Sequence, residues 1–211
     1  MAINKTLKVV LVEPAGPINV GSVARLCENF SVHELRLVSP KCEYLDQEAK
    51  MMAVKGLKIL EKAKVYEDLN SALSDCTRII ATCGRKEHGE IPLNSNKDAL
   101  SWALKSEREE TIALVFGRED RGLSNEELLK ANKVISLNTN ENYPSLNLSH
   151  AVAIVLHQFN QLNDLDLLKH HTKTSSPANL IKLEDCINEA GSLLFDIGFL
   201  MKHTYKAKMT I

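Results

Sequence analysis

The stretch LKVVLVEPAGPINVGSVARLCENF, residues 7–30, contains the first strand-to-helix transition of the chain. Residues 7–12 form an uninterrupted apolar run, which is typical of a strand buried on both faces of a sheet. Between residues 18 and 30 apolar side chains recur at helical spacing, so this segment is predicted to be the first helix. A buried strand that leads directly into a helix is the beginning of a parallel βαβ unit.

The same alternation continues along the chain. Strands are predicted at 7–12, 35–39, 64–66, 78–83, 111–117 and 133–137. Helices are predicted at 18–30, 56–63, 68–76, 97–106, 124–131 and 146–162, with Asp68 as the N-cap of the third. The pattern predicts an α/β fold in which a mostly parallel sheet is flanked by helices on both faces.

A polar segment that contains Thr-Ser-Ser-Pro separates this alternation from the C-terminal residues. We therefore divide the chain into a main domain at 1–163, a linker at 164–178 and a C-terminal helical extension with a basic tail at 179–211. From Ile197 onward the tail has lysines and a histidine but no acidic residue. Such a tail suits contact with RNA phosphate, and a solvated chain end explains it equally well.

The overall composition is that of an ordinary globular protein. At 211 residues, with 44% apolar and 25% charged residues, the chain can form one substantial core plus a small appendage. Neither a membrane-spanning run nor a cleavable signal peptide is recognisable, and the five cysteines contain no C-x-x-C pair. We therefore predict a cytoplasmic protein without a metal site, disulfides or membrane attachment. The net charge of −1 means that any RNA contact must come from local patches.

The two glycines of the opening stretch suggest a nucleotide-binding loop. Gly16 and Gly21 are five positions apart and Ser22 follows, which is close to the spacing of a P-loop. That motif requires lysine where this chain has Ser22, so a P-loop NTPase is excluded. Gly21 either leaves room for a ligand or reflects close packing. On its own the stretch favours Asn19 as a helix N-cap and Arg25 as a surface residue.

A second cluster, LVFGREDRGLSNEEL, spans residues 114–128. Gly117 ends a predicted strand, and ligands of open α/β sheets bind at the carboxyl ends of strands. Ser124 and Glu127 have the spacing of a capping box, which explains them structurally. Glu119 lies in the loop before that box, where no local structural role explains it. It is therefore a candidate functional residue.

A third cluster, LNTNENYPSLNLSHAVAI, spans residues 137–154 and predicts either Ser145 or Asn147 as a helix N-cap. The helix that follows is apolar over more than one face, which indicates that a partner covers its second side. In a fourth segment, ATCGRKEHGE at 81–90, a strand ends in a basic loop. Cys83 has no neighbouring pattern of a nucleophile and is interpreted as a small residue that lines a site.

Three motifs occur in these clusters in a fixed order. They are Asn19-x-Gly21 with Arg25, then Phe116-Gly117-x-Glu119-x-x-Gly122-Leu123, then Ser145-Leu146-Asn147-Leu148-Ser149 with Ala151. Together they resemble the TrmH-like 2′-O-methyltransferases of the SPOUT superfamily over residues 7–162. The C-terminal helix and tail further resemble the TrmJ branch, which methylates a pyrimidine ribose in the tRNA anticodon loop, at position 32. Since family members usually continue for more helical residues, we expect a short or truncated C-terminus.

The resemblance implies a trefoil knot in the C-terminal half of the α/β domain, S-adenosylmethionine as cofactor, and a homodimer whose active site is shared between subunits. The implied cofactor-binding residues are Thr82, Cys83, Gly84, Gly117, Leu137, Pro144, Ser145 and Leu146. Family members often have Ser-Ala where this chain has Cys83-Gly84. The implied catalytic residues are Arg25, Asn19, Glu119, Ser145 and Asn147. Candidate RNA contacts are Arg85, Lys86, His88, Lys202, Lys206 and Lys208.

The expected substrate is tRNA rather than DNA, because the reacting 2′-hydroxyl exists only in RNA. A guanidinium stays protonated at neutral pH, so we interpret Arg25 as a clamp on the phosphate beside the target ribose rather than as a base. Asn19 and Asn147 would hold the hydroxyl or the arginine, and Glu119 would orient a cationic partner. Two alternatives are a ribosomal RNA 2′-O-methyltransferase of the same superfamily and a non-catalytic dimer that binds S-adenosylmethionine or RNA.

Overall fold

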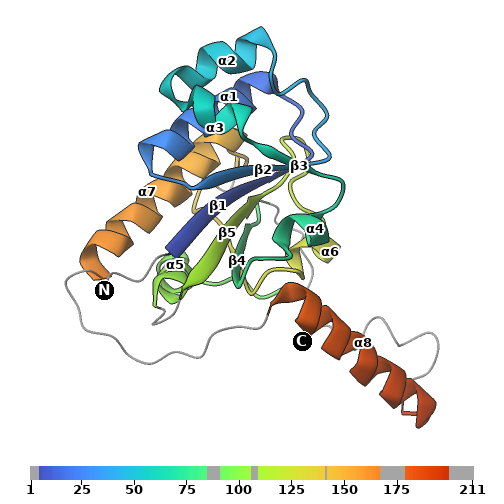
Figure 1. Ribbon diagram of the computed structural model, residues 1–211. Coiled ribbons are helices and arrows are strands. Elements are labelled where there is room, and N and C mark those ends of the chain that lie inside the picture. The colour runs from blue at the N-terminus through green and yellow to red at the C-terminus, as the bar shows by residue number, and fades with distance from the viewer. Residues whose placement is uncertain (1–4, 85–90, 106–108, 141, 167–178, 200–211) are drawn as a thin grey trace.

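The computed structural model describes residues 5–84, 91–105, 109–140, 142–166 and 179–199. Six strands form one sheet in the order β3-β2-β1-β5-β4-β6, and every neighbouring pair is parallel (Figure 1). The strands are β1 (Lys5–Val12), β2 (Glu34–Val38), β3 (Lys64–Tyr66), β4 (Arg78–Thr82), β5 (Glu110–Phe116) and β6 (Lys133–Ile135). The predicted α/β fold with a parallel sheet flanked by helices is confirmed.

Helices cover both faces of this sheet. They are α1 (Pro17–Asn29), α2 (Gln47–Ala53), α3 (Leu57–Glu61), α4 (Leu69–Leu73), α5 (Asn96–Leu104), α6 (Asn125–Leu128), α7 (Leu148–Asp166) and α8 (Leu180–Asp196), with a 3₁₀ turn at Val54–Gly56. Helix α7 packs against α1 and α5 on one face, while α4 and α6 lie on the other. Among the described residues, no helix combines the length and the apolar character needed to cross a membrane.

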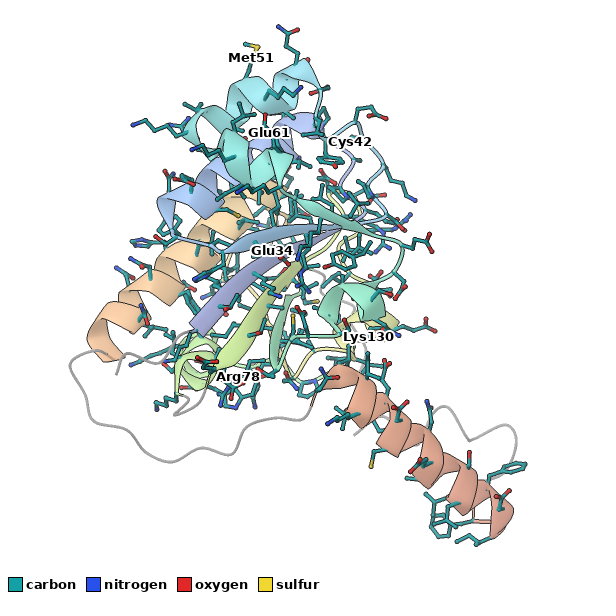
Figure 2. All side chains as sticks on the ribbon, viewed as in Figure 1. Glu34, Cys42, Met51, Glu61, Arg78 and Lys130 are labelled. Atoms are coloured by element: carbon teal, nitrogen blue, oxygen red, sulfur yellow. The ribbon has the colours of Figure 1, made fainter. Side chains whose placement is uncertain are left out.

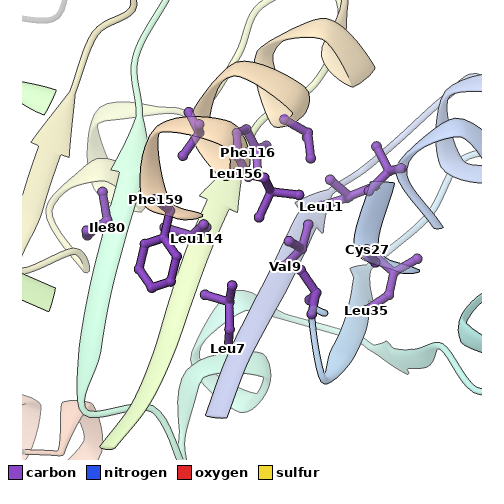
Figure 3. Close-up of a cluster of buried hydrophobic side chains, with 14 of the residues drawn as sticks. Leu7, Val9, Leu11, Cys27, Leu35, Ile80, Leu114, Phe116, Leu156 and Phe159 are labelled. Atoms are coloured by element: carbon purple, nitrogen blue, oxygen red, sulfur yellow. The ribbon is translucent and has the colours of Figure 1, made fainter. Parts of the chain in front are cut away.

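The alternation of side chains along β1 divides the core into two parts. Val9 and Leu11 point to the side of α1, α5 and α7, where they meet Phe116 and Leu156 (Figure 3). Val10 points to the opposite side, among residues of α4 and α6. All of these side chains are buried, which explains why the first apolar run has no polar interruption.

Helix α2 is the one helix of residues 5–84 that the sequence pattern did not predict. Its side chains Met51 and Met52 are exposed and only Ala49 and Ala53 are buried, so no apolar stripe marks it. It packs so closely on α1 that a Cβ added to Gly21 would lie 2.1 Å from the carbonyl oxygen of Ala49. Close packing, rather than room for a ligand, therefore accounts for Gly21.

A buried cluster of charges lies where β1, β2 and α4 meet. Arg36 of β2 is 1% exposed and donates from Nη1 and Nη2 to both carboxylate oxygens of Asp75, at 2.7 and 2.8 Å. Lys8 of β1 is also buried and donates to Asp75 Oδ2 at 2.6 Å. Glu34, labelled in Figure 2, accepts from Arg36 Nε and pairs with Lys64. Two buried cations thus share the carboxylates of Asp75 and Glu34, and Asp75 makes the shorter contact with Lys8.

The C-terminal part of the described chain differs in detail from the sequence-based boundaries. Helix α7 runs to Asp166, four residues beyond its predicted end at 162. Most of the predicted linker, 167–178, lies outside the described residues. Helix α8 begins after the N-cap Asn179, whose side-chain amide also donates to the carbonyl oxygen of Ser74. The helix is thereby attached to the end of α4 and projects away from the sheet (Figure 1).

Candidate active site

A cavity of about 140 Å³ lies at the carboxyl ends of β4 and β5, beside the start of α7. Its walls come from three segments that are distant in sequence. They are Thr82, Cys83 and Gly84, then Phe116 to Gly122, then Leu137, Pro144, Ser145, Leu146, Leu148 and Ala151. All eight residues predicted to bind a cofactor therefore lie around one cavity. Their role as cofactor contacts stays a prediction.

Glu119 connects this cavity to the beginning of α1. Its carboxylate accepts from the backbone N–H groups of Ala15 and Gly16, both at 3.1 Å, and from Asn19 Nδ2 at 3.0 Å. The N-cap of α1 is Gly16, and Asn19 is the third residue of the helix, so the prediction of Asn19 as N-cap was wrong. The carboxylate of Glu119 satisfies donors at this helix end instead, where a negative charge is favourable.

Asn147 connects the same network to α7. Its Nδ2 donates to Asn19 Oδ1 at 3.0 Å, while its Oδ1 accepts from the backbone N–H and the hydroxyl of Ser149, at 2.9 and 2.7 Å. Of the two predicted N-cap candidates, Asn147 therefore caps α7, and Ser145 lines the cavity. The order Glu119–Asn19–Asn147 brings together three of the five predicted catalytic residues by direct hydrogen bonds.

The two ends of this network determine how both amides are oriented. Glu119 accepts three N–H groups, and Asn19 accordingly presents its nitrogen to Glu119 and its oxygen to Asn147. Asn147 must then donate with its nitrogen and cap α7 with its oxygen. Each amide nitrogen keeps a second hydrogen that no hydrogen bond within the described residues uses. The network therefore leaves one N–H donor on each amide available for an oxygen acceptor.

Arg118 holds the loop that carries Glu119. Its guanidinium donates to Glu127 through Nη1 and Nη2, at 2.8 and 2.9 Å, and through Nε to Glu13 Oε2 at 2.7 Å. The hydrogen bond from Arg118 holds the pKa of Glu13 below its ordinary value, against the opposing effect of burial. Glu13 directly follows β1 and has a positive φ of 46°, a conformation that the ion pairs help to maintain.

Sequence reasoning missed Arg118 and Glu13. The available signal was that a charged residue follows each of two predicted strands within two positions, Glu13 after β1 and Arg118 after β5. Arg118, Glu13 and Glu127 leave one negative charge, which Lys41 balances at 3.9 Å from Glu13. Glu119, Asp120 and Arg121 then leave a net charge of −1 around the cavity. The charged residues at this end of the sheet therefore favour a cationic ligand over an anionic one.

We expect replacement of Gly117 by alanine to distort this loop. A Cβ at Gly117 would lie 2.3 Å from backbone atoms of Gly122 and Leu123, which cannot move without shifting the loop. Overpacking of this kind costs about 1–3 kcal/mol, so thermal unfolding should show a lower Tm for Gly117→Ala. Gly84→Ala is the control, because a Cβ there meets no described atom within 4 Å. An unchanged Tm for Gly117→Ala would contradict the expected clash.

Arg25 does not belong to the hydrogen-bonded network Glu119–Asn19–Asn147 of its own chain. It is exposed on α1, six residues after Asn19 and so roughly 120° around the helix, and it forms no hydrogen bond or ion pair with a described residue. The predicted RNA contacts lie outside the described residues: Arg85, Lys86 and His88 in one segment, and Lys202, Lys206 and Lys208 in another.

Comparisons with known proteins identify the family of the chain. The sequence matches the SpoU rRNA Methylase family over residues 6–157. It is 41% identical over 156 residues to a protein of Methanocaldococcus jannaschii named tRNA (cytidine-2′-O-)-methyltransferase TrmJ, covering 72% of this chain and 66% of that protein. It is 27% identical over 204 residues to tRNA (cytidine/uridine-2′-O-)-methyltransferase TrmJ of Photorhabdus laumondii, a match that covers 94% of this chain and 83% of that protein. The crystal structure of TrmJ from Z. mobilis is similar to this structure, with a TM-score of 0.79 and 25% sequence identity. The match covers 97% of this chain and 87% of that chain.

Proposed function

Because the chain belongs to the SpoU rRNA Methylase family, we propose that it transfers the methyl group of S-adenosylmethionine to a ribose 2′-hydroxyl of tRNA. Membership confirms the resemblance to the TrmH-like RNA methyltransferases and their TrmJ branch. The names of the two relatives support tRNA as substrate and a pyrimidine as target, cytidine in the first and cytidine or uridine in the second. We further propose an anticodon-loop nucleotide, at position 32, as the target.

The observation that carries this proposal is the hydrogen-bonded chain Glu119–Asn19–Asn147, which begins at Glu119 in the wall of the cavity. The spare N–H groups of Asn19 and Asn147 suit an oxygen acceptor such as a ribose hydroxyl, and Ser145 lines the cavity. Glu119 already accepts three N–H groups, so its role is to orient Asn19 and the start of α1. Precise orientation accounts for a large part of catalysis in a two-substrate transfer.

The cavity fits the proposed cofactor in its donor set and its charge. Leu137, Leu146 and Leu148 offer apolar contact for an adenine ring, and the strand ends at Thr82–Gly84 and Gly117 offer backbone groups. The net negative charge of the surrounding side chains suits a sulfonium cation. When bound, the cofactor supplies an activated methyl group, and the residues of this chain position the hydroxyl that receives it.

We also propose a homodimer in which Arg25 reaches the site of the partner subunit and grips the phosphate beside the target ribose. The exposed position of Arg25, on a different side of α1 from Asn19, supports a shared site, as does the exposed apolar side chain Ile154 on α7. We propose that residues 1–163 form a cytoplasmic methyltransferase domain with a trefoil knot, followed by the linker at 164–178 and the extension at 179–211. The basic residues at 85–88 and 202–208 would contact tRNA phosphates.

The function is tested by incubating the protein with labelled S-adenosylmethionine and bulk RNA, followed by nucleoside mapping of separated tRNA and ribosomal RNA. We expect 2′-O-methylated cytidine or uridine in the tRNA fraction. Label in ribosomal RNA alone would favour the ribosomal alternative. No label in either fraction, with the cofactor still bound, would favour a non-catalytic binder.

Replacing Arg25 by lysine should lower kcat by about tenfold or more, because an ammonium group cannot form the bidentate contact of a guanidinium with phosphate. Single-turnover methylation of tRNA measures the change, with cofactor affinity as the reference for an intact fold. A variant that keeps nearly full kcat and only binds RNA more weakly would argue against a bidentate role.

The shared site has its own test by complementation. Arg25→Ala and Glu119→Ala should each be inactive alone, while a refolded equal mixture should regain roughly a quarter of the wild-type activity, because half of the dimers then hold one complete site. If the mixture stays inactive although mixed dimers form, Arg25 and Glu119 act within one subunit.

A further inference from the structure

A second cavity, of about 810 Å³, lies between α5, α7 and the end of β6. We call it the amide cleft, because half of its ten lining residues carry a carboxamide: Asn94, Asn96, Asn138, Gln158 and Gln161. It shares no lining residue with the cavity at the carboxyl ends of β4 and β5, and the proposed methyl transfer does not use it. A space of this volume can hold a ligand of nucleotide size.

The carboxamides of the amide cleft have unused hydrogen-bonding groups. Asn96 Nδ2 donates to Gln158 Oε1 at 3.4 Å, which is long for such a bond. The side chains of Asn138 and Gln161 form no hydrogen bond with a described residue. Since each carboxamide has two N–H donors and a carbonyl acceptor, most of these groups are left for a ligand. A donor beside an acceptor is the arrangement with which asparagine and glutamine recognise the edge of a nucleobase.

The charge of the amide cleft also suits a nucleotide. Lys97 is its one charged lining residue; Asp98 follows in the chain but is not part of the walls. This contrasts with the net negative charge around the other cavity. A lysine beside neutral amides fits a ligand that joins a phosphate to an uncharged polar ring. Leu100 and Leu162 provide apolar surface for the face of that ring.

The edge of the sheet beside the amide cleft is already paired. Strand β6 lies at the end of the strand order, but Asn94 occupies its outer side at Val134. The backbone N–H of Asn94 donates to the carbonyl oxygen of Val134 at 2.7 Å, and Asn94 Oδ1 accepts from the N–H of Val134 at 3.3 Å. An added β-strand of a protein partner would need these same groups. The ligand is therefore recognised by side chains.

The amide cleft adjoins the proposed cofactor cavity along three consecutive residues. Ser136 and Asn138 line the cleft, and Leu137 between them lines the cavity. Successive side chains of an extended segment point to opposite sides, so one short segment separates the two spaces. A ligand in the cleft thus lies close to the place where the methyl group is transferred.

We infer that the amide cleft binds a nucleobase of the RNA substrate, on a nucleotide near the one that is methylated. This inference rests on the proposed action on tRNA. Bases of single-stranded loops can turn outward and be recognised by hydrogen bonds along their edges. The carboxamides of α5 and α7 hold the edge of the base, and Lys97 contacts a neighbouring phosphate. The bound base places the target ribose and contributes to the choice of RNA.

The inference is tested with tRNAs that lack one base of the anticodon loop, each carrying an abasic nucleotide at a different position. We expect one position, other than the methylated one, at which loss of the base raises KM about tenfold or more. In a variant that combines Gln158→Ala with Gln161→Ala, intact tRNA should already show the higher KM. Removal of the same base should then raise it less than about threefold further. Asn160→Ala, on α7 outside the cleft, is the control and should behave as the wild type.

Equal factors for the wild type and the double variant at every loop position would overturn the inference. The affinity of the full chain for the same tRNAs, measured by fluorescence anisotropy without cofactor, separates it from the proposed function. Coupling in affinity without methylation of any tRNA would support the base site and contradict the methyl transfer. Methylation without coupling would do the reverse. If adenosine monophosphate binds the wild type but not the double variant while the tRNAs show no coupling, the cleft takes a free nucleotide, and RNA as its ligand is overturned.

Discussion

Replacing Glu119 by alanine should lower kcat for RNA methylation by at least about 100-fold while the chain still folds. The change removes the acceptor for the N–H groups of Ala15 and Gly16 and for the amide of Asn19. Asn19 is then free to rotate, and the orientation of Asn147 that depends on it is lost as well. The loss should appear mainly in kcat, because these residues orient the reacting hydroxyl rather than provide most of the binding surface.

Two further variants separate this role from a general loss of charge. Glu119→Gln keeps one carbonyl oxygen but places an N–H group opposite the donor of Ala15, so its activity should lie between the wild type and Glu119→Ala. Glu126→Ala removes an exposed carboxylate seven residues later and should leave kcat unchanged. Retention of kcat within about threefold in Glu119→Ala would show that the network is not needed for the reaction.

Replacing Asp75 by asparagine should destabilise the fold by about 2–4 kcal/mol, which lowers Tm by roughly 5–15 °C for a chain of this size. Arg36 and Lys8 are buried, so loss of Asp75 leaves them with Glu34 as their remaining carboxylate. Removing one partner of a fully buried ion pair lowers the free energy of unfolding by a larger amount. About half of the Asp75 side chain is exposed to water, which weakens the contribution of its ion pairs. Chemical unfolding followed by circular dichroism measures the change.

Asp120→Asn provides the control for this measurement. Its carboxylate is 72% exposed and lies 3.9 Å from Arg121, so its removal should change stability by less than about 0.5 kcal/mol. If Asp75→Asn were as stable as this control, water rather than Asp75 would have to satisfy the buried cations.

The effect of Asp75 should also depend on pH. The hydrogen bond from Arg36 holds the pKa of Asp75 well below its ordinary value, despite the opposing effect of burial. A carboxyl group whose pKa is lower in the folded than in the unfolded protein stabilises the fold. Its contribution is complete above the unfolded pKa, near 4, and is lost as the pH falls toward the pKa of the folded state. The difference in unfolding free energy between the wild type and Asp75→Asn should therefore be constant from about pH 8 to 5 and shrink below about pH 4. A difference that grows toward acid would contradict this assignment.

The sequence by itself determined the features that depend on neighbours within a few residues. Alternating apolar runs and helical stripes predicted the parallel α/β fold, and the caps at Asp68 and at Ser124 with Glu127 were also predicted correctly. These features follow from backbone periodicity and local hydrogen bonds, which a sequence displays directly. Helix α2 was missed because its exposed methionines and lysine leave no apolar stripe.

Only the tertiary structure decided which loops meet. Strands β1 and β5 are neighbours in the sheet, so Glu13 and Arg118 lie together although 105 positions separate them. The same adjacency brings Glu119 to the first turn of α1, where it replaces Asn19 as the group that satisfies the helix end and frees Asn19 to bind Asn147. Strand order is a property of the whole chain that no local pattern encodes. The candidate residues could be chosen from the sequence, but their partners and orientations followed from the order of the strands.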